Sequence, residues 1–315
     1  MSLSGVLNQL LQSLLVVAAA PLLMGWVNQC RAWLANRRGP GILQPYRTLH
    51  KLFHKDAALA EGASWLFRVN PYIQLGAMVL AASLVPMLAV DLPLAPAADV
   101  IALVGVFAVA RVFASLAAMD IGTAFGSLGA RREMFVGALA EPALLILFFN
   151  FSLVSHSTSL TTIVQTLAHQ QFVLHASLAF AAVAFVMVLL AENARIPVDN
   201  PATHLELTMI HEALILEYSA RHLALIEWAV AIKLFVYFAI GIACFLPWGI
   251  AQAGDWAAVP LATGLLLGKM ALAGAGLAVV ETVNAKLRLF RAPEFLATAF
   301  LLAMLGLLLH FVLQV

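Results

Sequence analysis

Two carboxylates and an arginine, Glu192, Asp199 and Arg195, follow a long apolar run and surround a proline at position 197. Three more carboxylates lie shortly downstream, at Glu206, Glu212 and Glu217. Carboxylates and cations that lie close together shift each other's pKa values and can exchange protons. In a chain that otherwise avoids charge, this spacing indicates proton transfer at the edge of an apolar segment.

The composition is that of a membrane protein. Hydrophobic residues occupy 63% of the 315 positions and charged residues only 10%. Soluble domains average about 45–50% apolar and about 25% charged residues, so a surface of this composition would aggregate in water. The net charge of +1 indicates no polyanionic partner, and we expect no nucleic-acid binding.

Eight apolar segments are long enough to cross a bilayer, which requires about 20 helical residues. They fall near residues 4–27, 71–91, 98–118, 134–155, 171–192, 227–248, 258–281 and 293–314. The period-2 alternation of a membrane barrel is absent, and only helices otherwise satisfy the backbone in lipid. The sequence predicts an all-α integral membrane protein with about eight transmembrane helices and one transmembrane domain, residues 1–315. The first run lacks the features of a cleaved signal, so we expect it to be retained.

The distribution of Lys and Arg predicts how these helices are oriented. Fourteen of the 17 basic residues lie in connections 28–70, 119–133, 193–226 and 282–292, and the other connections and both tails contain none. With eight spans, these four connections fall on one side, which the positive-inside rule places in the cytoplasm. Both termini are therefore expected outside the cytoplasm.

The first cytoplasmic loop, residues 28–70, is predicted to carry a short amphipathic helix at the membrane surface. A Gly-Pro-Gly turn signal precedes the stretch 43–53, which places apolar residues on one face beside basic ones. Two interpretations remain open: a solvated basic connector at the lipid headgroups, or a docking surface for a cytoplasmic partner. The candidate docking residues are Arg37, Arg38, Gly39, Pro40, Arg47 and Lys51.

Charged residues also lie inside the predicted spans, among them Arg111, Glu141 and Lys233. Each costs roughly 2.5–3.5 kcal/mol at the bilayer centre on insertion scales. One interpretation is structural pairing, for example of Arg111 with Glu141, which would hold neighbouring helices together. The number of such residues favours the other interpretation, a hydrated path along which protons move.

The acidic cytoplasmic loop, residues 193–226, is predicted to be non-helical around Pro197 and Pro201. A helix is then expected to begin near Thr203 and to place Glu206 and Glu217 on one face. The loop is too apolar to stand free in water. We therefore expect it to pack, with its carboxylates buried, against the bundle or against a partner.

No cofactor site is predicted in this chain. Cys30 and Cys244 are too isolated for an iron–sulfur or zinc site, and the H-E-x-x-H and glycine-rich phosphate-binding motifs are absent in any usable context. A stand-alone secondary transporter is typically built from an inverted repeat with broken helices, and no such repeat is seen in this sequence. These absences favour a non-catalytic membrane subunit without a redox centre of its own.

Several separated motifs resemble the membrane subunit that closes the quinone chamber of respiratory complex I. They are AENARIPVDNPATHLEL at 191–207, EYS at 217–219 and GPGILQPYRTLHKL at 39–52. The resemblance covers nearly the whole chain. Within this superfamily, RRGPG at 37–41, AVARVFA at 108–114 and MDIGTAFGSLGARREMFVGALAEP at 119–142 look closer to the membrane-bound [NiFe] hydrogenase branch of formate hydrogenlyase and hydrogenase-4.

The third loop departs from the complex I pattern. Complex I members usually carry more glutamates there, whereas Ala202 and His204 stand at two such positions and about three residues are inserted before Glu217. These departures favour the hydrogenase branch. The alternative is a complex I subunit that binds quinone between the first span, the first loop and the third loop.

The resemblance implies a bacterial inner-membrane subunit that anchors a cytoplasmic arm. That arm would contain iron–sulfur clusters and a hydrogenase-like subunit with or without nickel, and antiporter-like membrane subunits would translocate ions. Quinone is implied only under the alternative. The resemblance places the proton path at Glu141, Glu192, Asp199, Glu206 and Glu217, with Arg195 as the arginine of the loop motif. Expected burial adds Arg111 and Lys233 to this path.

Overall fold

The computed structural model describes residues 3–90, 92–169, 176–199, 209–251, 257–287 and 291–313. These ranges contain helices and two isolated β-bridges but no strand. Helices that are long and apolar enough to cross a membrane are α1 (Leu3–Leu34), α4 (Val100–Asp120), α5 (Ala124–Ser155), α9 (Ala220–Phe245), α10 (Val259–Val283) and α11 (Ala292–Leu313). The prediction of an all-α, multi-pass membrane protein is confirmed.

Two further helices occupy the remaining predicted spans. They are α3 (Trp65–Leu84) and α7 (Ala176–Glu192), the second of which is only 17 residues long. A short helix, α6 (Leu160–His169), and a 3₁₀ turn, η1 (Ala95–Ala97), lie in the connections. Eight spans therefore remain an approximate count, since six described helices meet the length and hydropathy of a membrane span.

Several helices extend beyond the predicted spans. Helix α1 continues to Leu34, and α9 begins at Ala220 rather than near residue 227. Helix α5 begins at Ala124, ten residues before the predicted start, and the Thr123 side chain caps it by accepting from the Gly126 N–H at 3.3 Å. Hydropathy identifies the apolar part of a helix, whereas these helices continue through polar residues into the loops.

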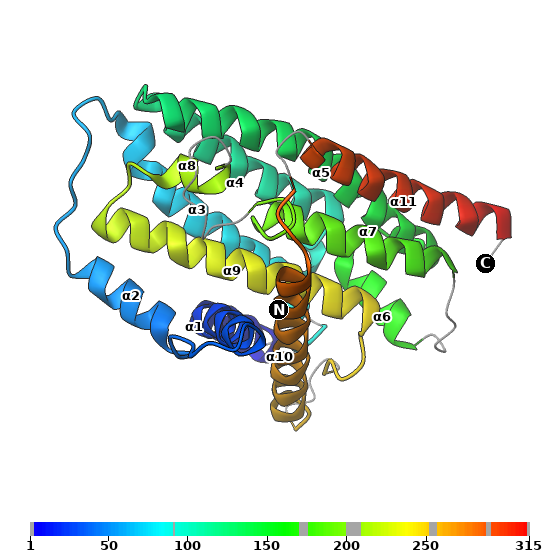
Figure 1. Ribbon diagram of the computed structural model, residues 1–315. Coiled ribbons are helices and arrows are strands. Elements are labelled where there is room, and N and C mark those ends of the chain that lie inside the picture. Colours follow the sequence, from blue (N-terminus) through cyan, green and yellow to red (C-terminus); the bar gives the residue numbers. More distant parts are fainter. Residues whose placement is uncertain are drawn as a thin grey trace.

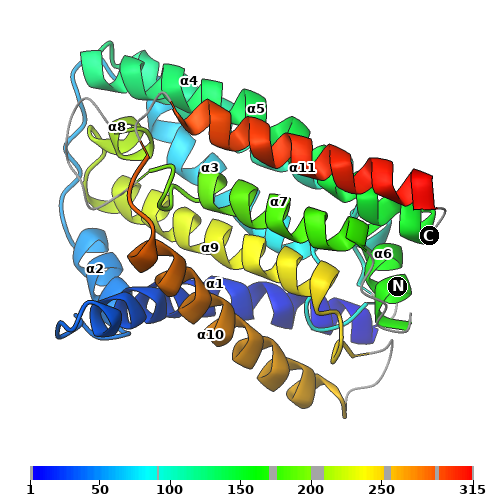
Figure 2. The same ribbon diagram turned by 45° about the vertical axis from the view of Figure 1, so that its right-hand side comes forward.

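Helix α9 is the central helix of the bundle. All of its residues from Leu234 to Ile240 are buried, and it contacts α1, α3, α7 and α10 among others. Figure 2 shows α9 between α7 and α1, with α5 and α11 beyond α7. Helices α2 and α8 lie at one end of the bundle (Figures 1 and 2), and Figure 2 shows both ends of the chain at the opposite end.

The predicted amphipathic helix of the first loop is present as α2 (Gln44–Phe53). Leu49 and Leu52 are buried against Ala224 of α9, and the Phe53 ring packs edge-on against Trp228 at 6.3 Å. The basic residues of the helix face away from this contact and are exposed. Apolar packing on one face therefore fixes α2 along α9, as Figure 1 also shows.

The prediction for the acidic loop is partly wrong. Helix α8 contains only His211–Ile215, and Thr203 and Glu206 lie outside the described residues. Glu217 is exposed and lies in a turn instead of on a helical face. The chain turns here because the Tyr218 ring is buried and stacks on Phe67 at 3.9 Å, while its hydroxyl donates to the Phe67 carbonyl at 3.1 Å.

The first loop and the acidic loop are joined at this turn. The Ser219 hydroxyl donates to the Ala58 carbonyl at 2.8 Å and accepts from the Ala58 N–H at 3.0 Å. Ser219 is also the residue immediately before α9, and its hydroxyl makes no capping bond to that helix. The first loop is therefore bonded directly to the start of the central helix.

At the opposite end of the bundle, Gln12 of α1 supplies hydrogen-bond partners for the backbone at the C-terminal end of α3. Its amide donates to the carbonyls of Ala82 and Val85 at 3.0 and 2.7 Å, and its oxygen accepts from the Met87 N–H at 3.1 Å. Buried backbone groups need such partners wherever a helix ends inside lipid. The segment after α3 can therefore stay buried although it is not helical.

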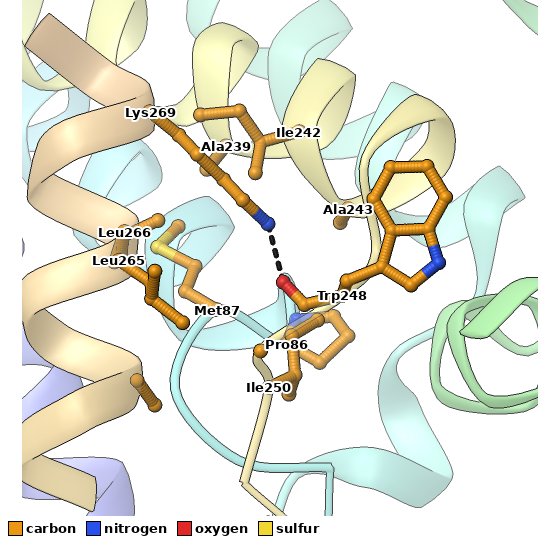
Figure 3. A pocket seen from close by; sticks show the side chains of 12 residues that line it. Pro86, Met87, Ala239, Ile242, Ala243, Trp248, Ile250, Leu265, Leu266 and Lys269 are labelled. Atoms are coloured by element: carbon orange, nitrogen blue, oxygen red, sulfur yellow. Dashed lines mark hydrogen bonds between the residues drawn. The ribbon is translucent and has the colours of Figure 1, made fainter.

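Lys269 of α10 likewise supplies a hydrogen-bond donor for the backbone carbonyls at the end of α9. Its ammonium donates to the carbonyls of Leu246, at 2.6 Å, and of Trp248. Figure 3 shows the ammonium pointing at the Trp248 carbonyl among apolar neighbours such as Met87 and Leu266. A cation is favourable at a helix C-terminus, where unpaired carbonyls carry partial negative charge. The pocket beside it has about 10 Å³, room for roughly one water molecule.

Candidate functional site

Arg111 of α4 lies at the centre of a buried cluster of charged residues. Its side chain is only 5% exposed, and its guanidinium contacts Glu141 of α5 and Glu192 of α7. Its Nε atom lies 3.4 Å from Glu133 of α5. The pairing of Arg111 with Glu141 that the sequence indicated is therefore present, but one arginine serves three carboxylates from two helices.

The spacing on α5 explains how the arginine fits. Glu133, Gly137 and Glu141 are four residues apart and share one face of the helix. A Cβ atom at Gly137 would collide with the guanidinium of Arg111. The missing side chain at Gly137 therefore provides the space in which Arg111 reaches the carboxylates on either side.

Glu192 connects this cluster to the central helix. One oxygen contacts Arg111, and the other lies 3.0 Å from the ammonium of Lys233 on α9. Tyr237 follows one turn later on α9 and is fully buried, with its ring centroid 6.0 Å from the same ammonium. Glu192, the last residue of α7, therefore pairs with two cationic side chains: Arg111 from α4 and Lys233 from α9.

A second group of charges lies in the acidic loop around Asp199. The Asp199 carboxylate accepts from the ammonium of Lys286 at 3.0 Å and from the backbone N–H of His211 at 3.2 Å. Burial alone would raise the pKa of this carboxyl. The charged form is nevertheless favoured by His211 and Lys286, which lower the pKa to about 2. Asp199 therefore stays ionised throughout the physiological range.

His211 of α8 connects the two groups. Its Nε2 atom lies 3.2 Å from Glu133, and its Nδ1 atom lies 3.7 Å from Asp199. Helix α8 packs against α4 and α5, and the close approach of Ala213 to Gly129, at which a Cβ would lie 2.7 Å away, fixes this contact. The acidic loop and the Arg111 cluster are therefore continuous through one imidazole ring.

Arg195 belongs to a third group of charges. Its guanidinium lies 3.2 Å from Glu281 near the end of α10, and Glu281 lies 3.6 Å from Arg31 near the end of α1. Arg195 and Glu281 are buried. This pair holds the start of the acidic loop between α1 and α10 and makes no ion pair with the Arg111 cluster among the described residues.

A cavity of about 400 Å³ adjoins all three groups. Its walls come from α1, α3, α4, α8, α9, the end of α7 and the start of the acidic loop. Charged residues in its lining are Arg31, Glu192, Arg195, His211, Glu212, Glu227 and Lys233. A smaller pocket of about 200 Å³ lies between α1, α2 and α9, and it shares Met24, Asn28 and Glu227 with the larger cavity. A cavity of this size and polarity can hold several water molecules.

The predicted path residues therefore divide into separate locations. Arg111, Glu141, Glu192 and Lys233 form one cluster, and Asp199 is joined to it through His211. Arg195 lies in the third group, Glu217 is exposed at the turn before α9, and Glu206 lies outside the described residues. The predicted docking residues are exposed at the surface of the first loop, except that Gly39 packs closely on Gln29. Their docking role stays a prediction.

Glu133, His211, Glu281 and Lys286 were not among the predicted site residues. Glu133 lies one residue before the predicted span, although its spacing of eight residues from Glu141 is a signal that it shares a helical face. His211 gave no comparable signal, because its partners are 12 and 78 residues away in the sequence. Among the described residues, no group of three or more His, Cys, Asp or Glu side chains is arranged to hold a metal ion.

The fold and the buried ion pairs define a class of membrane subunit. Residues 8–312 match the NADH dehydrogenase family, and the chain belongs to this family. Over 301 residues it is 32% identical to formate hydrogenlyase subunit 4 of Escherichia coli (strain K12), covering 96% of this chain and 97% of that protein. It is also 34% identical over 248 residues to hydrogenase-4 component C of the same organism, covering 78% and 77%.

A solved structure has the same fold. It is described as the membrane-bound sulfane sulfur reductase (MBS), an archaeal respiratory membrane complex, and the match covers 95% of this chain and 98% of that chain. The TM-score is 0.76 at 20% sequence identity, which establishes the common fold alone. The two Escherichia coli relatives are named as a subunit and a component, so this chain is related to parts of multi-subunit membrane assemblies.

Proposed function

We propose that this chain is the membrane anchor and proton-coupling subunit of an energy-converting hydrogenase-type complex of the formate hydrogenlyase and hydrogenase-4 kind. The identities of 32% and 34% with subunits of those complexes support the choice of complex. One structural observation supports the coupling role. A continuous series of ion-paired groups connects the acidic loop with Lys233 on the central helix, beside a cavity of about 400 Å³.

The arrangement suits proton movement because its cations are shared between carboxylates. Arg111 contacts Glu133, Glu141 and Glu192 together, so a proton that neutralises one carboxylate strengthens the arginine's attraction to the others. Glu192 is in addition shared between Arg111 and Lys233. A charge change in the cavity would therefore redistribute the pairs across α4, α5, α7 and α9. The chain itself holds no redox centre in this proposal.

The partners belong to the same proposal. Hydrophilic subunits with iron–sulfur clusters and a hydrogenase-like site would dock on the cytoplasmic side at the exposed basic residues of the first loop. Antiporter-like membrane subunits would contact the bundle within the bilayer. Both termini would then lie outside the cytoplasm of a bacterium, as the distribution of basic residues predicts.

The test begins with purification of the tagged chain from its native membrane. Co-purification of subunits with iron–sulfur absorption supports the complex, and isolation of the chain alone contradicts it. Glu192→Gln in the assembled complex, reconstituted into liposomes, is expected to reduce proton flux per electron transferred while electron transfer continues. The control is Glu61→Gln in the exposed part of the first loop. Normal coupling in Glu192→Gln would remove the cluster from the path.

One observation favours a second candidate function. The pocket of about 200 Å³ between α1, α2 and α9 adjoins the larger cavity, so a ligand entering beside α2 would reach the charged site. This is the location at which a complex I subunit is expected to bind quinone. Quinone-dependent NADH oxidation by the purified complex would favour this alternative over the hydrogenase-type assignment.

A further inference from the structure

We propose that His211 is the proton carrier between the cavity and the Arg111 cluster, with Asp199 as its fixed counter-charge and Glu133 as the proton acceptor. This proposal rests on the proposed function. Its geometric basis is one imidazole ring whose two nitrogens face two different carboxylates, at 3.7 Å from Asp199 and 3.2 Å from Glu133. The ring is 26% exposed and lines the cavity.

The surroundings of His211 favour its titration. Burial alone would lower its pKa, but the negative charges of Glu133 and Asp199 outweigh that effect and raise the pKa above its ordinary value. Asp199, in contrast, has a pKa of about 2 and stays charged. The titratable group that can take up and release a proton near neutral pH at this junction is therefore the imidazole.

Other charged groups near the ring come from several neighbouring elements. Lys233 on α9 acts on the ring itself, and Glu212 is the next residue of α8. The two carboxylates beside the ring have cations of their own: Arg111 on α4 lies near Glu133, and Arg132 on α5 and Lys286 after α10 act on Asp199. Lys286 is one of the groups that keep Asp199 ionised.

The transfer is a simple proton exchange. Water in the cavity delivers a proton to Nδ1, which forms an N–H bond beside the Asp199 carboxylate. The N–H bond at Nε2 then breaks as its proton bonds to an oxygen of Glu133. The neutral ring recovers its starting tautomer by rotation or by exchange with water. No electron is transferred, and the proton is gained by the carboxylate that contacts Arg111 at 3.4 Å.

The experiment uses the complete complex in liposomes and measures proton flux per electron transferred as a function of pH. His211→Gln keeps side-chain polarity without a titratable ring, and we expect a roughly 100-fold loss of flux near neutral pH, together with the loss of the wild-type pH dependence. The control is His222→Gln, which replaces a buried histidine of α9 that faces Tyr72 instead of carboxylates. This variant is expected to keep both the flux and its pH dependence.

A second variant separates chemistry from structure. His211→Ala leaves space beside the cavity, and added imidazole is expected to restore a measurable part of the flux. Wild-type flux and pH profile in His211→Gln would overturn the proposal, as would an absence of rescue by imidazole in assembled His211→Ala complex. If Glu192→Gln loses coupling while His211→Gln keeps it, the proposed function stands and His211 is excluded. If both variants retain full coupling, the proposed function fails as well.

Discussion

Two lysines lie within neighbouring membrane helices, and they serve different partners. Lys233 of α9 lies 3.0 Å from the carboxylate of Glu192, within a network of titratable groups beside a cavity of about 400 Å³. Lys269 of α10 donates to the carbonyls of Leu246 and Trp248 beside a pocket of about 10 Å³. A charge inside a membrane helix is therefore not by itself a sign of proton transfer. What distinguishes the two sites is whether the partner can exchange a proton.

The largest expected difference comes from replacing each lysine by methionine. In Lys233→Met, Glu192 loses one of its two cations, and we expect coupled proton flux to fall to background, because the carboxylate then depends on Arg111 alone. In Lys269→Met, the carbonyls at the end of α9 lose their donor. We expect a destabilisation of about 1–3 kcal/mol with unchanged flux per electron.

Both effects can be measured on the same preparations, from thermal unfolding of the purified complex and from dye-reported proton flux in liposomes. Equal losses of flux in the two variants would contradict the distinction between the sites. A selective loss in Lys233→Met would instead strengthen it.

A smaller effect is expected from a substitution that leaves every charged residue in place. Gly137→Ala places a Cβ atom where the guanidinium of Arg111 lies, so the arginine must move away from Glu133 or Glu141. Overpacking of this kind typically costs about 1–3 kcal/mol, and we expect a partial loss of coupled flux. The matched control is Gly268→Ala on α10, where a Cβ would meet no atom within 4 Å.

The control has a definite expectation of its own. Alanine favours a helix interior over glycine by roughly 0.5–1 kcal/mol, so Gly268→Ala should be neutral or slightly stabilising and should leave flux unchanged. If Gly137→Ala behaves in the same way, Arg111 does not need the space that this glycine provides.

The smallest effect concerns the pH dependence of the acidic loop. The folded-state pKa of Asp199 is lowered from 3.8 to about 2, so its contribution to stability is present above the unfolded value and is lost as the pH falls through about 2. Lys286→Met removes one cause of this shift. We expect the pKa of Asp199 to rise by about one unit, equivalent to about 1.4 kcal/mol.

The measurement is hydrogen–deuterium exchange of residues 209–215, because the His211 amide donates to Asp199. In Lys286→Met this segment should lose protection at a higher pH than in the wild type, on lowering the pH from about 5 to about 2. Identical protection curves would show that Lys286 does not hold the loop. Lys51→Met, on the exposed face of α2, is the control.

The fold was largely predictable because hydropathy and helix length depend on local sequence. The amphipathic helix α2 was predicted within one residue from the alternation of Leu49 and Leu52 with basic residues. The turn at Glu217 was not, because it is determined by the stacking of Tyr218 on Phe67, which is 151 residues away in the sequence. No local pattern contains a contact of that kind.

The sequence indicated which residues belong to the site better than it indicated which of them pair with each other. Burial in apolar segments identified Arg111, Glu141 and Lys233, and their pairing follows from the cost of an unpaired charge in lipid. The sharing of Arg111 among three carboxylates depends on how α4, α5 and α7 cross, and on the vacant position at Gly137. His211 could not be selected because its role comes from the position of α8 on the bundle.

The paired hydrogen bonds between Ser219 and Ala58 have a mechanical consequence. They join the first loop to the start of α9, and Lys233 follows Ser219 by 14 residues, about 21 Å along the helix. A helix is stiff along its axis. A subunit that displaces the first loop would therefore displace the helix that carries the ammonium beside Glu192.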